Sequence, residues 1–341
     1  MKKALLIGIN DYPAGNELRG CIEDINNVKA VIERHGDGSP NFSVKMMPNV
    51  QTSGEAMEAI QKLFAGDNDT ALLYFSGHGY ANNTGAEIVM PQDIAIPSQY
   101  YTGIQMSTIM SIVNNSHVHN KVVILDCCHS GNMGKYNLQD AGSILNTGVS
   151  VLTACREDEV AMEAGGHGLF TELLCAGLNG GASDFCGNIT IGGVYAYIDR
   201  SFGPWDQRPV FKTNVTEFAP LRKVEPQVSL SVIRELTNLF IDPNKDIDLD
   251  PSFEDTNDPS VHHKYITPYA DANNVRKFKM LQKLQSIGFV KPINEEFMYF
   301  AAMHSTGCKL TELGKYYWRL VNEGRTVSYT HLRAHETPEH L

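Results

Sequence analysis

Short apolar runs alternate with amphipathic segments along the first 220 residues of the chain. Most of these runs are rich in Val, Ile, Leu or aromatic residues, which is typical of strands buried on both faces of a sheet. The runs lie at Ala4–Ile9, Phe42–Met47, Ala71–Phe75, Lys121–Leu125 and Ser150–Ala154.

The segments between the runs carry apolar residues at helical spacing. Cys21–His35 and Met106–Val113 are two of them. A third, Thr52–Phe64, begins with Thr52 and has Glu55 three residues later, which is the pattern of a capping box. This alternation predicts an α/β fold with a mostly parallel sheet and helices on both faces.

Polar clusters follow three of the predicted strands. They are Ser76–Gly79, Asp126–Gly131 and the loop that leads to Leu18–Asp24. Sites in parallel sheets form just beyond the carboxyl ends of the strands, so we expect these clusters to meet at one edge.

The clusters hold a histidine and cysteines that suit nucleophilic catalysis, which needs a thiolate and a general base. His78 stands between two glycines, although a structural loop histidine is the alternative. Side chains alternate along a strand, so Asp126 and Cys128 share one face and Cys127 is expected to be buried on the other. A metal site formed by Cys127, Cys128 and His129 is disfavoured, because adjacent side chains project apart and no second cluster has ligand spacing.

The motifs Ser76–Gly79 and Asp126–Gly131 resemble those of caspase-like cysteine peptidases, in the metacaspase and bacterial orthocaspase form. The resemblance covers roughly residues 3–220 and implies the caspase–haemoglobinase fold, with His78 and Cys128 as the catalytic dyad. Cys128 would attack the scissile carbonyl, and His78 would protonate the leaving amine and then activate water. We expect the backbone N–H groups of Gly79 and Cys128 to form the oxyanion hole. A role in a microbial stress or defence response is analogy alone.

Two acids lie near the predicted nucleophile. Asp126 shares its face, and Asp24 lies one helical turn after Cys21. A pair of carboxylates matches a guanidinium or an ammonium group. The resemblance implies that Asp24, Asp126, Ser76 and Cys21 line a pocket for Arg or Lys before the scissile bond. Glu23 stands where the family usually has Asn, and a first-turn acid favoured by the helix dipole is the alternative for Asp24.

Calcium activates some metacaspases, so the acidic run Asp246–Asp250 deserves comparison with a calcium-binding EF-hand loop. Pro251 and Asn257 stand where that loop needs Gly and Glu, so we interpret the run as a solvated connector. No cofactor is expected for the chemistry, and calcium activation stays open. Lys135 is either a self-cleavage point or a surface lysine.

Composition narrows the class of protein. The chain has 341 residues, 42% of them hydrophobic and 20% charged, which indicates about two globular domains and excludes a mostly disordered chain. The net charge of −11 argues against a whole-protein polyanion binder, and residues 1–220 carry −10 of it. The sequence has no apolar run of about 18 residues and no signal segment, so we expect no membrane span. With seven cysteines in such a chain, we expect reduced thiols and a cytoplasmic location.

The C-terminal region has a different charge balance, with ten basic and five acidic residues over 264–325. Its pattern of helix, hairpin and helix resembles a winged-helix domain. Such a domain binds DNA through a basic helix, or it serves as a structural or protein-binding unit. A regulator built on an inactive caspase-like scaffold is therefore the alternative function. The predicted elements are a helix over 273–287, strands at Phe289–Ile293 and Phe297–Ala302, and a helix that begins near Leu310.

These observations divide the chain into a caspase-like peptidase domain (1–222), an acidic helical connector (223–263) and a winged-helix-like domain (264–325). Residues 326–341 resemble a translated sequencing adapter, so they are set aside and the natural C-terminus is expected to be missing. The expected partner is a protein or peptide substrate with Arg or Lys before the scissile bond.

Overall fold

A computed structural model describes most of the chain and divides it into two compact units, Met1–Glu225 and Pro226–Leu341. His129, Lys135 and the tail from residue 326 onward lie outside the described residues. The described ranges are 1–13, 15–82, 85–94, 103–128, 145–154, 163–164, 167–202, 208–256, 261–264, 266 and 270–325.

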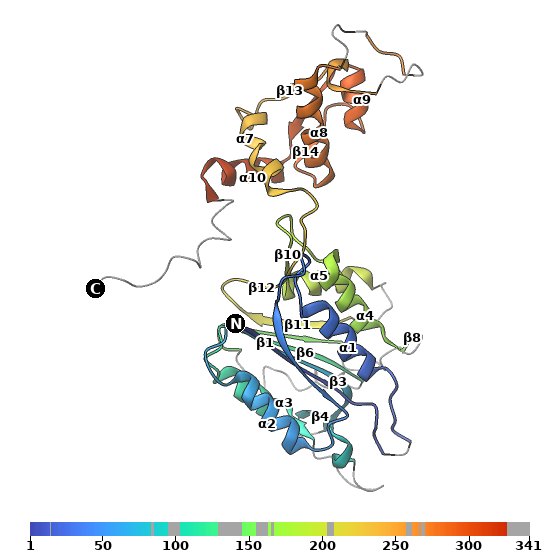
Figure 1. The fold of residues 1–341 in the computed structure, drawn as a ribbon, viewed down its shortest axis with the longest axis vertical. Coiled ribbons are helices and arrows are strands. Elements are labelled where there is room, and N and C mark those ends of the chain that lie inside the picture. Colours follow the sequence, from blue (N-terminus) through green and yellow to red (C-terminus); the bar gives the residue numbers. More distant parts are fainter. Residues whose placement is uncertain are drawn as a thin grey trace, which may run out of the picture. The chain divides into compact units, whose positions relative to one another are not determined.

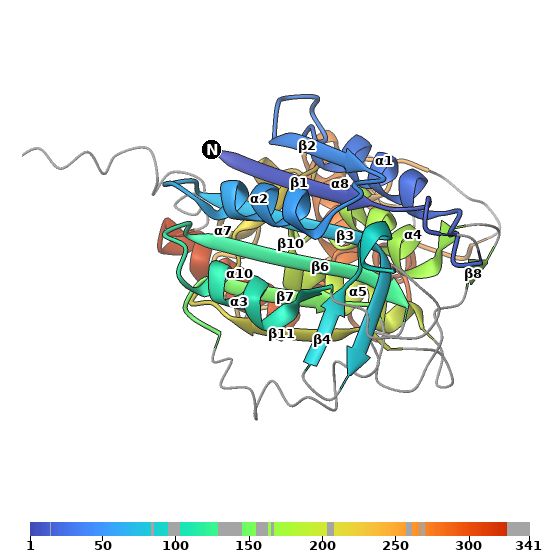
Figure 2. The same ribbon diagram turned by 90° about the horizontal axis from the view of Figure 1, so that it is seen from below.

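The first unit is built on a central sheet with the strand order β2-β1-β3-β6-β7-β11 (Figure 2). The first five of these strands are parallel, and β11 runs antiparallel to β7 at one edge. The apolar runs of the sequence therefore do form a mostly parallel sheet. The strands are β1 (Lys2–Gly8), β2 (Phe42–Pro48), β3 (Thr70–Asn82), β6 (Asn120–Cys128), β7 (Val149–Thr153) and β11 (Val210–Asn214).

Helices cover both faces of this sheet, as predicted (Figure 1). Helices α1 (Cys21–Ile32), α4 (Leu169–Ala176) and α5 (Ile191–Ser201) pack on the face that carries Leu6 and Tyr74. Helices α2 (Ser53–Phe64) and α3 (Met106–Asn114) pack on the face that carries Leu5 and Phe75. Because strand side chains alternate, neighbouring residues of one strand enter two different cores.

Smaller elements complete the unit. β3 continues beyond the sheet and pairs with β4, which in turn pairs with β5, and β10 pairs with β12. Two short helical turns, η1 and η3, follow β4 and α4. The bounds are β4 (Gly85–Ile88), η1 (Pro91–Asp93), β5 (Ile104–Gln105), β8 (Glu163–Ala164), β9 (His167–Gly168), η3 (Gly177–Gly181), β10 (Asn188–Thr190) and β12 (Pro220–Lys223).

The start of α1 is held against the end of β1. Asn10, in the loop after β1, accepts the backbone N–H of Cys21 at 3.0 Å and that of Ile22 at 3.4 Å through its Oδ1. This side chain does for α1 what an N-cap residue normally does, from a distant position in the chain. A Cβ at Gly8 would lie 2.4 Å from the Cys21 carbonyl oxygen, so only glycine allows this close approach.

The second unit contains a small antiparallel sheet with the order β13-β15-β14. Part of the segment predicted as an acidic connector (223–263) belongs to this unit, because β13 pairs with β15 and η4 packs against α8. The elements are α6 (Leu230–Arg234), α7 (Leu236–Leu239), β13 (Ile247–Asp248), η4 (Pro251–Phe253), α8 (Ala272–Ser286), β14 (Val290–Pro292), α9 (Met298–Met303), β15 (Gly307–Leu310) and α10 (Glu312–Asn322).

The predicted strand over Phe297–Ala302 is wrong, because this segment forms helix α9. Met298, Ala301 and Ala302 are buried at helical spacing, and this packing outweighs the strand preference of the aromatic residues between them. The winged-helix-like assignment stays a prediction. No helix in the described part of the chain is long and apolar enough to cross a membrane.

Candidate active site

The two polar motifs lie in one parallel ladder. β3 and β6 do not stop at their apolar runs: β3 continues through Ser76–Gly79, β6 continues into its motif as far as Cys128, and His78 is the register partner of Cys128. Ser76 is the partner of Asp126 in the same ladder. Neighbouring strands lie about 4.8 Å apart, so the sheet brings the backbones of both pairs side by side.

Cys127 and Asp126 lie on opposite faces of β6, as strand alternation predicts. Cys127 is buried in the core that α2 and α3 cover. Asp126 lies on the other face, where its carboxylate contacts Thr171 of α4. The backbone of Cys128 ends β6, and its side chain lies outside the described part of the chain.

The half-buried ring of His78 is oriented by the loop after β1. Its Nε2 lies 2.8 Å from the carbonyl oxygen of Asn16. A carbonyl oxygen only accepts, so Nε2 carries a proton in this contact. The ring of Tyr12 lies against the imidazole, with the two ring centroids 4.5 Å apart.

The predicted acids belong to a cluster of buried polar side chains on the α1 and α4 face. Ser76 Oγ donates to Asp24 Oδ2 at 2.9 Å, and Thr171 Oγ1 donates to Asp126 Oδ2 at 2.6 Å. The Tyr74 hydroxyl lies 2.5 Å from Thr171 Oγ1, and because Thr171 gives its hydrogen to Asp126, Tyr74 donates to Thr171. Asp24 is 3% exposed and Asp126 9%, so both carboxylates are held away from water.

Burial makes the Asp126 carboxylate costly to ionise. It raises the pKa of Asp126 from 3.8 to about 7; the hydrogen bond from Thr171 opposes this rise, and the charge of Asp24 adds to it. A positive group that entered beside the two carboxylates would stabilise the ionised form. The cluster is therefore suited to hold a cation.

Two other predicted site residues lie beside these groups in the fold. Cys21 is the first residue of α1 and is buried one turn before Asp24. Gly79 follows His78 in β3 and has Ile88 of β4 as its register partner.

The sequence reasoning missed Tyr12, Asn16, Tyr74 and Thr171. Tyr74 and Thr171 stand inside apolar segments, where they are indistinguishable from core residues. Only the pairing of distant elements shows that their hydroxyls support an acid.

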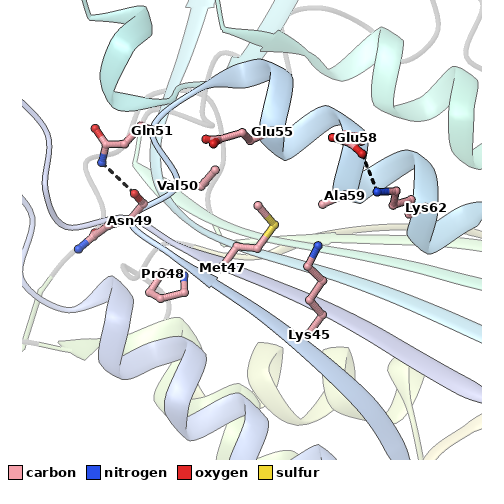
Figure 3. A pocket seen from close by; sticks show the side chains of 10 residues that line it. All are labelled: Lys45, Met47, Pro48, Asn49, Val50, Gln51, Glu55, Glu58, Ala59 and Lys62. Atoms are coloured by element: carbon pink, nitrogen blue, oxygen red, sulfur yellow. Dashed lines mark hydrogen bonds and ion pairs between the residues drawn. The ribbon is translucent and has the colours of Figure 1, made fainter.

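A cavity of about 440 Å³ lies elsewhere, between β2 and α2 (Figure 3). Several of its polar side chains already have partners: Lys62 pairs with Glu58, and Gln51 donates to the Asn49 carbonyl. It contains none of the predicted site residues. Within the described ranges, no three His, Cys, Asp or Glu side chains are grouped to hold a metal ion.

Fold and site together define a class of protein. It is an α/β domain in which a histidine and a cysteine are neighbours on adjacent parallel strands, beside a buried pair of acids.

Comparison with known proteins gives the family. The profile of the caspase domain matches residues 1–217, and the chain belongs to this family of cysteine peptidases. Metacaspase-1 of Lodderomyces elongisporus is 41% identical over 86 residues, 23% of this chain and 19% of that protein. Metacaspase-1B of Aspergillus fumigatus is 30% identical over 151 residues, 38% of this chain and 35% of that protein. The chain thus matches only about a third or less of the length of these relatives.

Two solved structures are also similar. A protein from Geobacter sulfurreducens has a TM-score of 0.49 and 19% identity, covering 66% of this chain and 100% of that one. Caspase-1 from Spodoptera frugiperda has a TM-score of 0.47 and 15% identity, covering 66% of this chain and 90% of that one.

Proposed function

We propose that this chain is a cysteine endopeptidase that hydrolyses peptide bonds after Arg or Lys, with Cys128 as nucleophile and His78 as general acid and base. The observation that carries this proposal is the register of β3 and β6, which makes these two residues neighbours. Membership of the caspase domain family supports it.

The reaction proceeds by acyl transfer. The Cys128 thiol gives its proton to the imidazole of His78, and the resulting thiolate attacks the scissile carbonyl carbon while the backbone N–H groups of Gly79 and Cys128 stabilise the oxyanion. His78 passes this proton to the leaving amine, which departs as the new N-terminus. His78 then removes a proton from water, and the hydroxide formed releases the acyl group from the sulfur.

The preference for a basic residue rests on the buried acids. Asp24 and Asp126 lie on the sheet face to which the alternation of β6 also assigns position 128. Two carboxylates neutralise the charge of a guanidinium or ammonium group there, whereas they would repel the negative charge of a substrate Asp side chain.

The decisive experiment compares the chain with its Cys128→Ala variant on a peptide library, with and without calcium. We expect cleavage after Arg and Lys, and no cleavage by the variant. Cys127→Ala is the matched control, because it removes the adjacent thiol from the opposite core and is expected to retain activity.

Three outcomes would contradict the proposal. Cleavage that persists in Cys128→Ala excludes the nucleophile. Cleavage after Asp excludes the basic specificity. A folded chain that cleaves nothing in either condition supports the alternative of a scaffold without peptidase activity.

A second candidate function concerns the second unit, where α8 carries the exposed residues Arg276, Lys277 and Lys283. These cations support binding to DNA phosphates. The test is titration of duplex DNA with the full chain at several salt concentrations. If the three residues bind phosphates, their triple substitution by Gln reduces the slope of log affinity against log salt by about 3. An unchanged slope excludes this function for α8.

A further inference from the structure

A tyrosine hydroxyl is inserted between β3 and the chain that follows β4, at the position of His78. His78 lies across from Val89, and the Val89 N–H donates to the His78 carbonyl at 3.0 Å, as in an ordinary antiparallel pair. The return bond is replaced. The His78 N–H donates to the Tyr12 hydroxyl at 2.9 Å, and this hydroxyl donates to the Val89 carbonyl at 2.9 Å.

The neighbouring glycine makes room for this hydroxyl. A Cβ at Gly77 would lie 2.6 Å from the Tyr12 hydroxyl oxygen and 2.8 Å from the Phe75 ring. A glycine beside a catalytic residue can let a substrate backbone approach closely. For Gly77 the structure gives a different reason, since its missing side chain is the space that Tyr12 fills.

Tyr12 therefore fixes His78 at two points. Its hydroxyl holds the backbone N–H, and its ring lies against the imidazole. We propose that Tyr12 is a positioning residue for His78, which sets the position of the imidazole through the backbone of β3. This inference rests on the proposed function, because it assigns to Tyr12 a part in the chemistry of His78.

Tyr12 does not itself transfer a proton. Its side chain is only 4% exposed, and burial raises its pKa well above the ordinary value. The hydroxyl also uses its single hydrogen on the Val89 carbonyl. The effect of Tyr12 on the reaction therefore goes through the geometry of His78.

The test is the variant Tyr12→Phe, which keeps the ring and removes the hydroxyl. We expect kcat for an Arg peptide to fall about tenfold with KM nearly unchanged, because a small displacement of a catalytic group affects the reaction more than binding. The limb of the pH–rate profile that reports His78 is expected to shift. Tyr195→Phe is the matched control, because Tyr195 of α5 stacks on Phe211 and is not one of the site residues.

A double-mutant cycle with Gly77→Ala tests the same contact independently. The Phe75 contact exists in both backgrounds and cancels in the cycle. We expect Gly77→Ala to lower kcat about tenfold more in the wild-type chain than in Tyr12→Phe. Additive effects would overturn the inference.

Hydrogen exchange at the His78 amide needs no variant and reports the contact without any substrate. Slow exchange is expected in the wild-type chain, and fast exchange would exclude the hydrogen bond to Tyr12. A wild-type chain with no peptidase activity refutes the proposed function. An active wild type whose Tyr12→Phe variant loses thermal stability but keeps kcat and the pH profile refutes this inference alone.

Discussion

Replacement of Asp126 by Asn tests the buried acid through the pH dependence of stability. The pKa of Asp126 is 3.8 in an unfolded chain and about 7 in the folded one. Between these values the folded chain holds a proton that the unfolded chain has released. The free energy of unfolding therefore falls as the pH rises through this window and levels off above it.

The expected size follows from the two pKa values. A difference of about 3 corresponds to about 4 kcal/mol, at about 1.4 kcal/mol for each pKa unit. Asp126→Asn does not titrate, and its amide oxygen still accepts from Thr171. The free energy of unfolding of the variant, taken relative to that of the wild type, should therefore increase by about 4 kcal/mol as the pH rises from 4 to 8.

Urea denaturation at several pH values measures this difference, because titrating groups that do not interact with Asp126 contribute equally in the two chains. Asp67→Asn is the control, because Asp67 is exposed and its replacement should leave the profile unchanged. For the wild type we also expect KM for Arg peptides to fall as the pH rises through about 7, and this dependence should vanish in Asp126→Asn. A stability difference that does not vary with pH would mean that Asp126 is hydrated, and the argument for a buried cation site would fail.

Three further substitutions each remove the hydrogen-bonding group of one side chain. Thr171→Val removes the donor to Asp126, so the pKa of Asp126 should rise further. The pH dependence of KM should then shift to higher pH, and urea denaturation should show a loss of stability of about 1–3 kcal/mol. Asn10→Ala removes the distant cap of α1 and should cost about 1 kcal/mol in the same assay. Trp318→Phe removes the 2.6 Å hydrogen bond from the indole Nε1 to the Phe240 carbonyl and should lower the stability of the second unit by about 1 kcal/mol. Unfolding followed by far-ultraviolet circular dichroism measures this loss, because the signal comes from the backbone.

Much of the first unit could be predicted because its local and global signals agree. Buried strands are apolar without interruption, and the Thr52 side chain accepts from the Glu55 N–H as the capping box requires. The order of strands and helices then left few topologies. The positions of the two motifs at one edge of the sheet followed from that order alone.

The supports of the site could not be predicted in the same way. Thr171 reaches Asp126 across 45 residues of sequence, and Tyr12 reaches His78 across 66. No spacing rule links such pairs, since each depends on how helices and loops pack on the finished sheet. In the second unit, α9 was missed because Tyr299 and Phe300, which lie between the buried Met298 and Ala301, favour a strand locally.

The buried acid cluster also bears on the order of events when the chain is made. Its members come from α1, β3, β6 and α4, and Thr171 of α4 is the last of them to be synthesised. A ribosome adds about 5–20 residues per second, so this helix leaves it seconds after the segment that carries Cys128. Until then Asp126 lacks its hydroxyl donor. In the nascent chain the proposed nucleophile is therefore synthesised before the acid cluster that we propose to select a basic residue is complete.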